Sequence, residues 1–152
     1  MLDTLIDDKD FAQIMQKNIE NLIIHFFEKE QNFGILCKID DVLFNPVLPQ
    51  EIEDNFRDMT LFFLAGYTFE TAHVTDGYLV FEAGFGVDNI GSVVSVPLYS
   101  IIQVIVDETP VLINLSTFKA KKEEVKKVDN NGVKNSMDSF LSNPENSKFM
   151  KK

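Results

Sequence analysis

Apolar residues recur at three- and four-residue steps in the first long segment of the chain. Between Asp8 and about Glu30 these positions are Phe11, Met15, Ile19, Leu22, Ile23 and Phe26. The period places them on one face of an α-helix, and Asp7 or Asp8 is suited to cap its first turn. Ile24 and Phe27 widen the apolar arc, so the helix can pack on its own domain and on a second copy. We therefore expect an amphipathic N-terminal helix and a homodimer formed through it.

Beyond Phe33 the hydrophobic pattern changes to a period of two, which is typical of β-strands. The predicted strands are 34–39, 60–65, 69–74, 77–85, 92–96 and 111–117, with a shorter extended piece in 42–49. Asp76-Gly77 is a tight hairpin signal between two of them. Residues 50–59 are polar and predict a short helix or an irregular excursion. Residues 96–106 are ambiguous, because β-branched residues favour a strand while Pro97 suits the first turn of a helix.

Composition and charge divide the 152 residues into a body and a tail. The chain is 45% hydrophobic, and the large apolar residues concentrate before position 119, which predicts one domain over 1–118 with a core of its own. That body holds 19 acidic against 5 basic residues, a net charge of −14. Residues 119–152 hold 9 lysines against 5 acids, a net charge of +4, and are too polar to form a core. We expect a flexible tail there.

The residues offer little for catalysis or for cofactors. Cys37 is the single cysteine, which excludes an internal disulfide, and His25 and His73 stand alone without metal-ligand spacing. No serine lies in a nucleophile-elbow motif, and the acidic body repels nucleic-acid phosphates. We therefore expect a protein that is not an enzyme, has no cofactor or metal and binds no nucleic acid.

The start of the chain is acidic rather than basic, and no apolar run approaches the ~20 residues that span a membrane. We expect a cytoplasmic protein without a membrane partner.

Three glycines within eight positions, Gly84, Gly86 and Gly91, raise the question of a phosphate-binding loop. Their spacing is not G-x-G-x-x-G, and they stand between two predicted strands rather than before a helix. They are interpreted as turn glycines. At alternate strand positions, Gly84 and Gly86 also leave room for another backbone to approach, which points toward peptide binding.

The segment DGYLVFEAGFG…VSVPLYSII resembles the central motif of the stringent starvation protein B family, adaptors that deliver tagged substrates to the ClpXP protease. The match lies in F-x-A-x-F-G on one strand and V-S-V-P on the next, and the order of the preceding elements agrees. The resemblance implies a mainly β fold with an N-terminal helix: a partly open Sm-like or SH3-like β-barrel in which a short helix follows Pro97. It also implies a dimer made by the N-terminal helix.

In that family, an extended degradation tag lies in a groove beside these two strands. Carried over to this chain, the resemblance implies the peptide-binding residues Phe81, Ala83, Phe85, Gly86, Val94, Val96 and Pro97. Small residues admit a peptide backbone while aromatic neighbours offer apolar pockets. The alternative is that Phe81, Phe85, Val94 and Val96 are ordinary inward-facing core residues.

The family's C-terminal motif is a short apolar-basic peptide that docks on the ClpX unfoldase. Here it is loosely matched by Lys148, Phe149, Met150, Lys151 and Lys152. The chain departs from the family in its longer 50–59 segment, its basic tail and the lack of arginines around the glycine motif. An acidic body opposes an acidic tag, so we expect a different, less acidic peptide.

Two functions from different classes follow. The first is a non-enzymatic adaptor that binds tagged or unfolded substrate peptides and delivers them to ClpXP. The second is a β-barrel scaffold or chaperone-like module that binds one dedicated protein partner without proteolysis. A small-ligand or RNA-binding barrel is disfavoured, because Arg57 is the single arginine and the body is strongly acidic.

Overall fold

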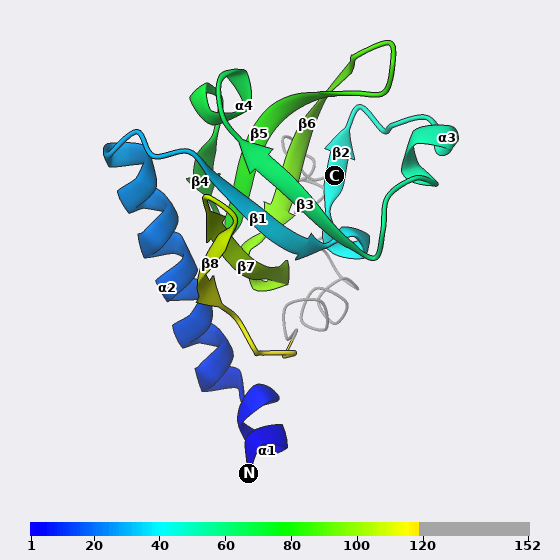
Figure 1. Ribbon diagram of the computed structural model, residues 1–152. Helices are drawn as coiled ribbons and strands as arrows, with labels where there is room; N and C mark the ends of the chain where they lie inside the picture. The colour runs from blue at the N-terminus through cyan, green and yellow to red at the C-terminus, as the bar shows by residue number, and fades with distance from the viewer. Residues whose placement is uncertain (119–152) are drawn as a thin grey trace, which may run out of the picture. The chain divides into compact units, whose positions relative to one another are not determined.

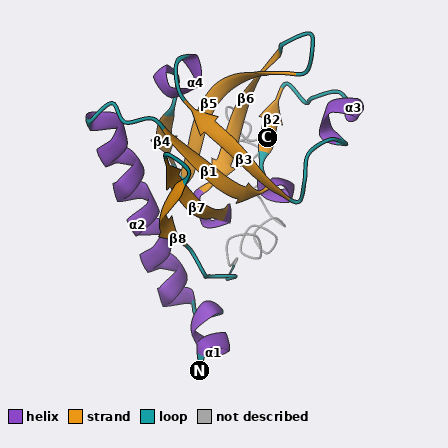
Figure 2. Cartoon of the chain, viewed as in Figure 1, coloured by secondary structure: helices purple, strands orange, loops and turns teal. Residues whose placement is uncertain are grey.

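The computed structural model describes residues 1–118, and all structural statements below concern these residues. Most of the chain from Phe33 onward is β-strand, and one long helix precedes it (Figure 2). The helices are α1 (Leu2–Ile6), α2 (Lys9–Glu28), α3 (Gln50–Glu53) and α4 (Tyr67–Glu70). The strands are β1 (Phe33–Lys38), β2 (Leu43–Asn45), β3 (Met59–Leu64), β4 (His73–Thr75), β5 (Tyr78–Phe85), β6 (Ile90–Pro97), β7 (Ile101–Val106) and β8 (Thr109–Ile113).

The strands form two antiparallel four-stranded sheets, in the orders β3-β1-β7-β8 and β2-β6-β5-β4. Figure 1 shows β1 and β3 crossing in front of β5 and β6. The chain passes from one sheet to the other four times: through the 3-10 turns Ile39–Asp41 after β1 and Leu98–Ser100 after β6, and through the segments that contain α3 and α4. The sheets do not close into one continuous barrel. A β-rich fold with an N-terminal helix, as expected from the sequence, is confirmed at this level.

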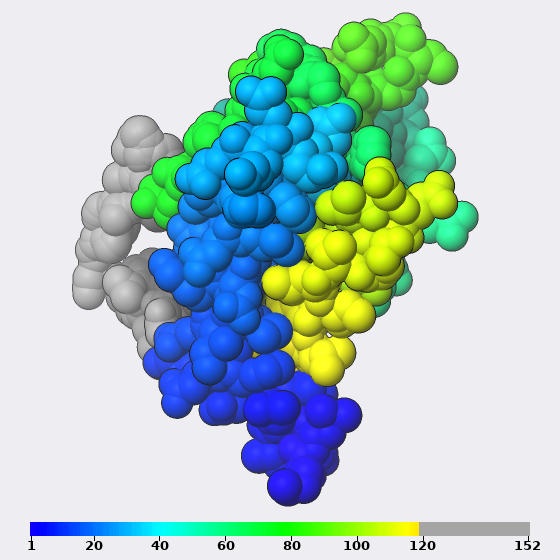
Figure 3. Space-filling model, turned by 60° about the vertical axis from the view of Figure 1, so that its left-hand side comes forward, coloured from blue at the N-terminus to red at the C-terminus, as the bar shows by residue number. Residues whose placement is uncertain are grey.

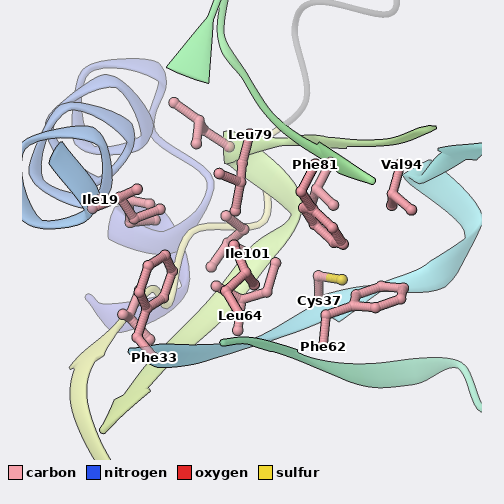
Figure 4. Packing of buried hydrophobic residues seen from close by; sticks show 14 of the residues in the cluster. Ile19, Phe33, Cys37, Phe62, Leu64, Leu79, Phe81, Val94 and Ile101 are labelled. Atoms are coloured by element: carbon pink, nitrogen blue, oxygen red, sulfur yellow. The ribbon is translucent and has the colours of Figure 1, made fainter. Parts of the chain in front are cut away.

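One apolar core fills the space between the inner faces of the two sheets (Figure 4). Phe33, Leu64 and Ile101 reach it from the first sheet, and Leu79 and Phe81 from the second. Inward and outward positions alternate along most of the strands, as on any pleated sheet, while an irregularity in the pairing of β7 with β1 places Ile101 and Val104, three residues apart, in the core. The core is therefore made by the period-two pattern that the sequence shows.

Helix α2 closes one side of this core. Its N-cap is Asp8, whose carboxylate accepts a hydrogen bond from the Phe11 N–H at 3.2 Å. Ile19 and Ile23 are fully buried, while Ile14 and Ile24 remain exposed on other sides of the helix. Figure 3 shows α2 (blue) and β8 (yellow) side by side on one face. The helix and its cap at Asp8 are therefore as the sequence predicts.

No helix within residues 1–118 is long and apolar enough to cross a membrane.

Two predicted elements differ from the structure. Residues 69–74 were expected as one strand, but the chain forms helix α4 and then the three-residue strand β4, because Gly66 turns with a positive φ of 60° and opens a helical turn. The helix that the family resemblance implies after Pro97 is a single 3-10 turn, followed by strand β7. Residues 101–106 form a strand rather than a helix, in agreement with the strand propensity of their β-branched side chains.

The Asp76-Gly77 hairpin is confirmed. Asp76 and Gly77 both have positive φ, 51° and 82°, as a two-residue hairpin turn between β4 and β5 requires.

Candidate functional site

A groove with a volume of about 650 Å³ lies over the part of the β5–β6 hairpin nearest its turn. Strands β5 and β6 line it, together with the segment around α4 and the end of β2. Its lining residues are Asn45, Pro46, Ala65, Tyr67, Thr68, Glu82, Ala83, Gly84, Asn89, Gly91, Ser92 and Val93. Its position beside two paired strands is that of a slot for an extended chain.

Two neighbouring pairs of small residues lie next to the turn of the hairpin, one pair on each side of the sheet. Ala83 pairs with Ser92 across the two strands, and Gly84 pairs with Gly91 at the next position. Two positions farther from the turn than Ala83 and Ser92, and on the same side of the sheet, the large side chains of Phe81 and Val94 are paired and fill the interior. The Gly84–Gly91 pair lies on the opposite, outward side of the two strands, and because glycine has no side chain the backbone of the hairpin is accessible there.

The two glycines of the outward pair have different surroundings. A Cβ on Gly84 would collide with the amide side chain of Asn89, so this space is already occupied by the protein itself. A Cβ on Gly91 would meet no atom within 4 Å, and its φ is not in the left-handed region. Open space in the groove is thus found above Gly91, where a bound chain can approach the backbone closely.

Hydrogen bonds hold both sides of the groove to the hairpin. On the β2 side, the Ser92 hydroxyl donates to the Pro46 carbonyl at 2.9 Å. On the α4 side, the Tyr67 hydroxyl donates to Glu82 Oε1 at 2.5 Å, and this hydrogen bond raises the pKa of Tyr67. The Glu82 N–H in turn donates to the Thr71 hydroxyl at 3.0 Å. Both walls are therefore fixed relative to β5 and β6.

The charge of the groove is that of Glu82, the one ionised side chain among the described residues that line it. Asn45, Asn89 and the hydroxyl of Tyr67 add neutral polar groups. Because the body around it carries a net charge of −14, the groove disfavours acidic ligands.

The structure divides the seven residues that the family resemblance implied as peptide-binding. Ala83 lines the groove. Phe81, Val94 and Val96 are at most 1% exposed and belong to the core, and Pro97 is also buried at the end of β6. The Phe81 ring packs against Phe62 with centroids 5.6 Å apart. These four side chains support the strands from within, and none of them lines the groove.

Phe85 and Gly86 lie at the end of the hairpin, next to the 50–59 segment. Phe85 is half-buried and packs edge-on against Phe44 and Phe56, at centroid distances of 5.6 and 6.0 Å. Gly86 has a φ of 76° and starts the hairpin turn, and a Cβ there would lie 3.0 Å from Ile52 Cδ1. Both residues therefore connect the hairpin to the α3 segment. The docking residues 148–152 lie outside the described residues.

A second hollow, of about 620 Å³, contains none of the residues predicted from the sequence. It is lined by Phe27, Glu30, Asn32, Gly66, Phe69, Glu70 and Ala72. Among residues 1–118, no three His, Cys, Asp or Glu side chains are placed to hold a metal ion. The groove over β5 and β6 lies on the two strands that carry the sequence motif, and Ala83 is the predicted residue that lines it.

Comparison of the chain with family models, with curated proteins and with solved structures found no match. The interpretation of the groove therefore depends on its own residues.

Cys37 is buried in β1, where its thiol donates to the Thr60 carbonyl at 3.6 Å. Burial, with the nearby carboxylate of Asp41 as a smaller cause, raises the pKa of Cys37 from 9.0 to about 12. The unfolded chain therefore loses this proton first as the pH rises. The contribution of the buried, protonated thiol to the free energy of unfolding is complete below pH 9 and is lost between pH 9 and pH 12.

We predict that raising the pH from 8 to 10.5 lowers the free energy of unfolding of the wild type more than that of Cys37→Ala, by about 2 kcal/mol. Urea unfolding of both proteins at the two pH values measures this difference. Burial also raises the pKa values of Tyr78 and Tyr99. Both tyrosines are present in the wild type and in the variant, so their contributions cancel in the difference. Equal losses in the two proteins would show that the thiol is not desolvated.

Proposed function

We propose that this protein is a non-enzymatic adaptor that binds an extended peptide in the groove over β5 and β6 and delivers the attached substrate to a ClpX-type unfoldase. The observation that carries the proposal is the Gly84–Gly91 pair on the outward side of β5 and β6, in a groove with walls at α4 and at the end of β2. A surface of two paired strands with open space at Gly91 can accept an extended backbone, because no side chain at that position keeps it away.

The resemblance to the stringent starvation protein B family supports the same proposal and gives it a partner. Its F-x-A-x-F-G and V-S-V-P motifs fall on β5 and β6, the two paired strands under the groove. The finer assignment of the two sheets to a partly open Sm-like barrel belongs to this proposal too. Delivery would use residues 148–152 as a tethered docking peptide, which raises the local concentration of the captured substrate at the protease.

The tag that we propose is neutral or basic. An acidic tag would face Glu82 within the groove and a net charge of −14 around it. Like charges of this kind slow association and cost affinity. A cytoplasmic location is part of the proposal, since that is where such a protease acts.

Binding to purified ClpX tests the delivery step. We expect the full chain to bind ClpX and a chain lacking residues 148–152 to lose most of that binding. Far-UV circular dichroism of both proteins controls for folding. If neither protein binds ClpX, delivery to this unfoldase is excluded, whatever the groove binds.

A scaffold for one dedicated partner is the second candidate. The observation that favours it is the acidic side chain of Glu82 in the groove, because it would repel an acidic tag. Affinity purification distinguishes the two functions. One stoichiometric partner indicates the scaffold, whereas many unrelated clients that share a tag indicate the adaptor.

A further inference from the structure

The outward face of the β3-β1-β7-β8 sheet carries apolar side chains. On β3, Met59, Leu61 and Phe63 are 52%, 57% and 60% exposed, while Phe62 and Leu64 between them point into the core. An antiparallel sheet with one face in water normally has polar residues at the outward positions. Strand β3 is therefore apolar on both of its sides.

The strand register continues this surface across the sheet. Leu61 lies opposite Leu36 of β1, which lies opposite Gln103 of β7, and Gln103 lies opposite Ile113 of β8. In the neighbouring row, Phe63 lies opposite Gly34 and then Ile105. We call the outer apolar face the set Leu36, Met59, Leu61, Phe63, Ile105, Val111 and Ile113.

Gly34 on β1 has no side chain, and neighbouring side chains of the outer apolar face cover its position. A Cβ on Gly34 would lie 3.2 Å from Phe63 Cδ1 and 3.4 Å from Leu61 Cδ1. Both side chains therefore lean over the glycine, and the face is continuous from β3 to β1. In Figure 1, β1 and β3 lie nearest the viewer and no helix crosses in front of them.

The outer apolar face also differs from the rest of the body in charge. None of the 19 acidic residues of the body occupies an outward position on its strands, and Lys38 is the charged residue there. Two copies that each carry a net charge of −14 repel one another over most of their surfaces. They can approach most closely through a face that carries no carboxylate.

We propose that the outer apolar face is the contact between two copies of this chain, with the two sheets packed face to face. Its five most exposed side chains are half-exposed or more and present on the order of 500 Å², a size at which an apolar surface patch is often functional. Together with the half-buried Leu36, Gln103 and Ile105, it approaches the ~800 Å² per partner of a stable interface.

This interface is distinct from the helix-mediated dimer that the sequence predicts. On α2, the exposed large apolar residues are Ile14 and Ile24, 56% and 38% exposed and ten positions apart. They do not form a continuous surface, because ten residues separate them by about 15 Å along the helix and by roughly 80° around it. The sheet face is therefore the better-founded contact.

Sedimentation velocity of the full chain, over a range of concentrations, tests the proposal. We expect a wild-type dimer, and at least a tenfold rise in its dissociation constant in Leu61→Glu and in Phe63→Glu. Ile14→Glu, on the exposed side of α2, and Val87→Glu, at the fully exposed hairpin tip, are the matched controls and remain dimeric.

Far-UV circular dichroism and thermal melts show whether each variant is folded. If a glutamate variant is not folded, the double variant Leu61→Gln, Phe63→Gln is measured in its place. A wild type that is monomeric at every concentration would overturn the proposal, and a partner of another kind would then cover the face. Dissociation by Ile14→Glu with no effect of Leu61→Glu would overturn it too, in favour of the helix.

Discussion

Replacing Phe81 with alanine is expected to lower the free energy of unfolding by about 3–5 kcal/mol. Phe81 is 1% exposed, and its ring lies against Phe62 at the centre of the core. The substitution removes the buried ring and leaves a cavity that the surrounding strands can only partly close. Chemical denaturation of the wild type and of the variant, followed by circular dichroism, measures the loss.

A matched pair on the same hairpin controls for general effects of truncation. Val94 is fully buried opposite Phe81, whereas Val87 is fully exposed at the hairpin tip. Val94→Ala is expected to destabilise clearly and Val87→Ala to leave the stability within about 0.5 kcal/mol of the wild type. If Phe81→Ala left the stability intact and reduced peptide binding alone, Phe81 would belong to the groove and not to the core.

Gly91→Val is expected to weaken peptide binding by about 100-fold, roughly 3 kcal/mol, while the protein stays folded. Gly91 lies under open space in the groove, and its backbone conformation is one that other residues adopt. A β-branched side chain suits a strand, so the fold tolerates it. The same side chain occupies the place of the bound backbone. Titration of the tightest peptide from an array, by calorimetry or fluorescence, measures the change.

Ser95→Val is the control for this variant. Ser95 shares the outward face of β6 with Gly91 but does not line the groove. Ser95→Val introduces the same side chain as Gly91→Val on the same strand. We expect the Ser95→Val protein to bind the peptide with the affinity of the wild type. Equal affinities of the wild type and Gly91→Val would show that the peptide binds elsewhere.

The elements with a strong period could be predicted from the sequence. The helix over Lys9–Glu28, its cap at Asp8 and the strands that build the core follow from alternation and from short-range capping chemistry. Residues 67–75 could not, because their apolar content resembles a strand while one backbone angle at Gly66 starts a helical turn. A single positive φ is not visible in a hydrophobic pattern.

The groove adjoins the two strands that the motif indicated, but most of the residues that line it were not among those predicted. The motif pointed to β5 and β6, yet its largest members, Phe81, Val94 and Val96, alternate into the core. The period of two carries that signal: the residues between them, Glu82, Gly84, Gly91 and Val93, face the other way. The walls at Pro46 and Tyr67 depend on tertiary contacts between distant segments, which no local pattern reveals.

Amide hydrogen exchange of the full chain, with and without its tightest array peptide, tests the central claim most directly. A bound extended chain is expected to slow exchange in 82–84 and 91–93 of the hairpin and in 65–68 beside α4, and to leave β7 and β8 unchanged. Protection confined to other segments, or no change with a peptide shown to bind, would contradict the assignment of the groove as the peptide site.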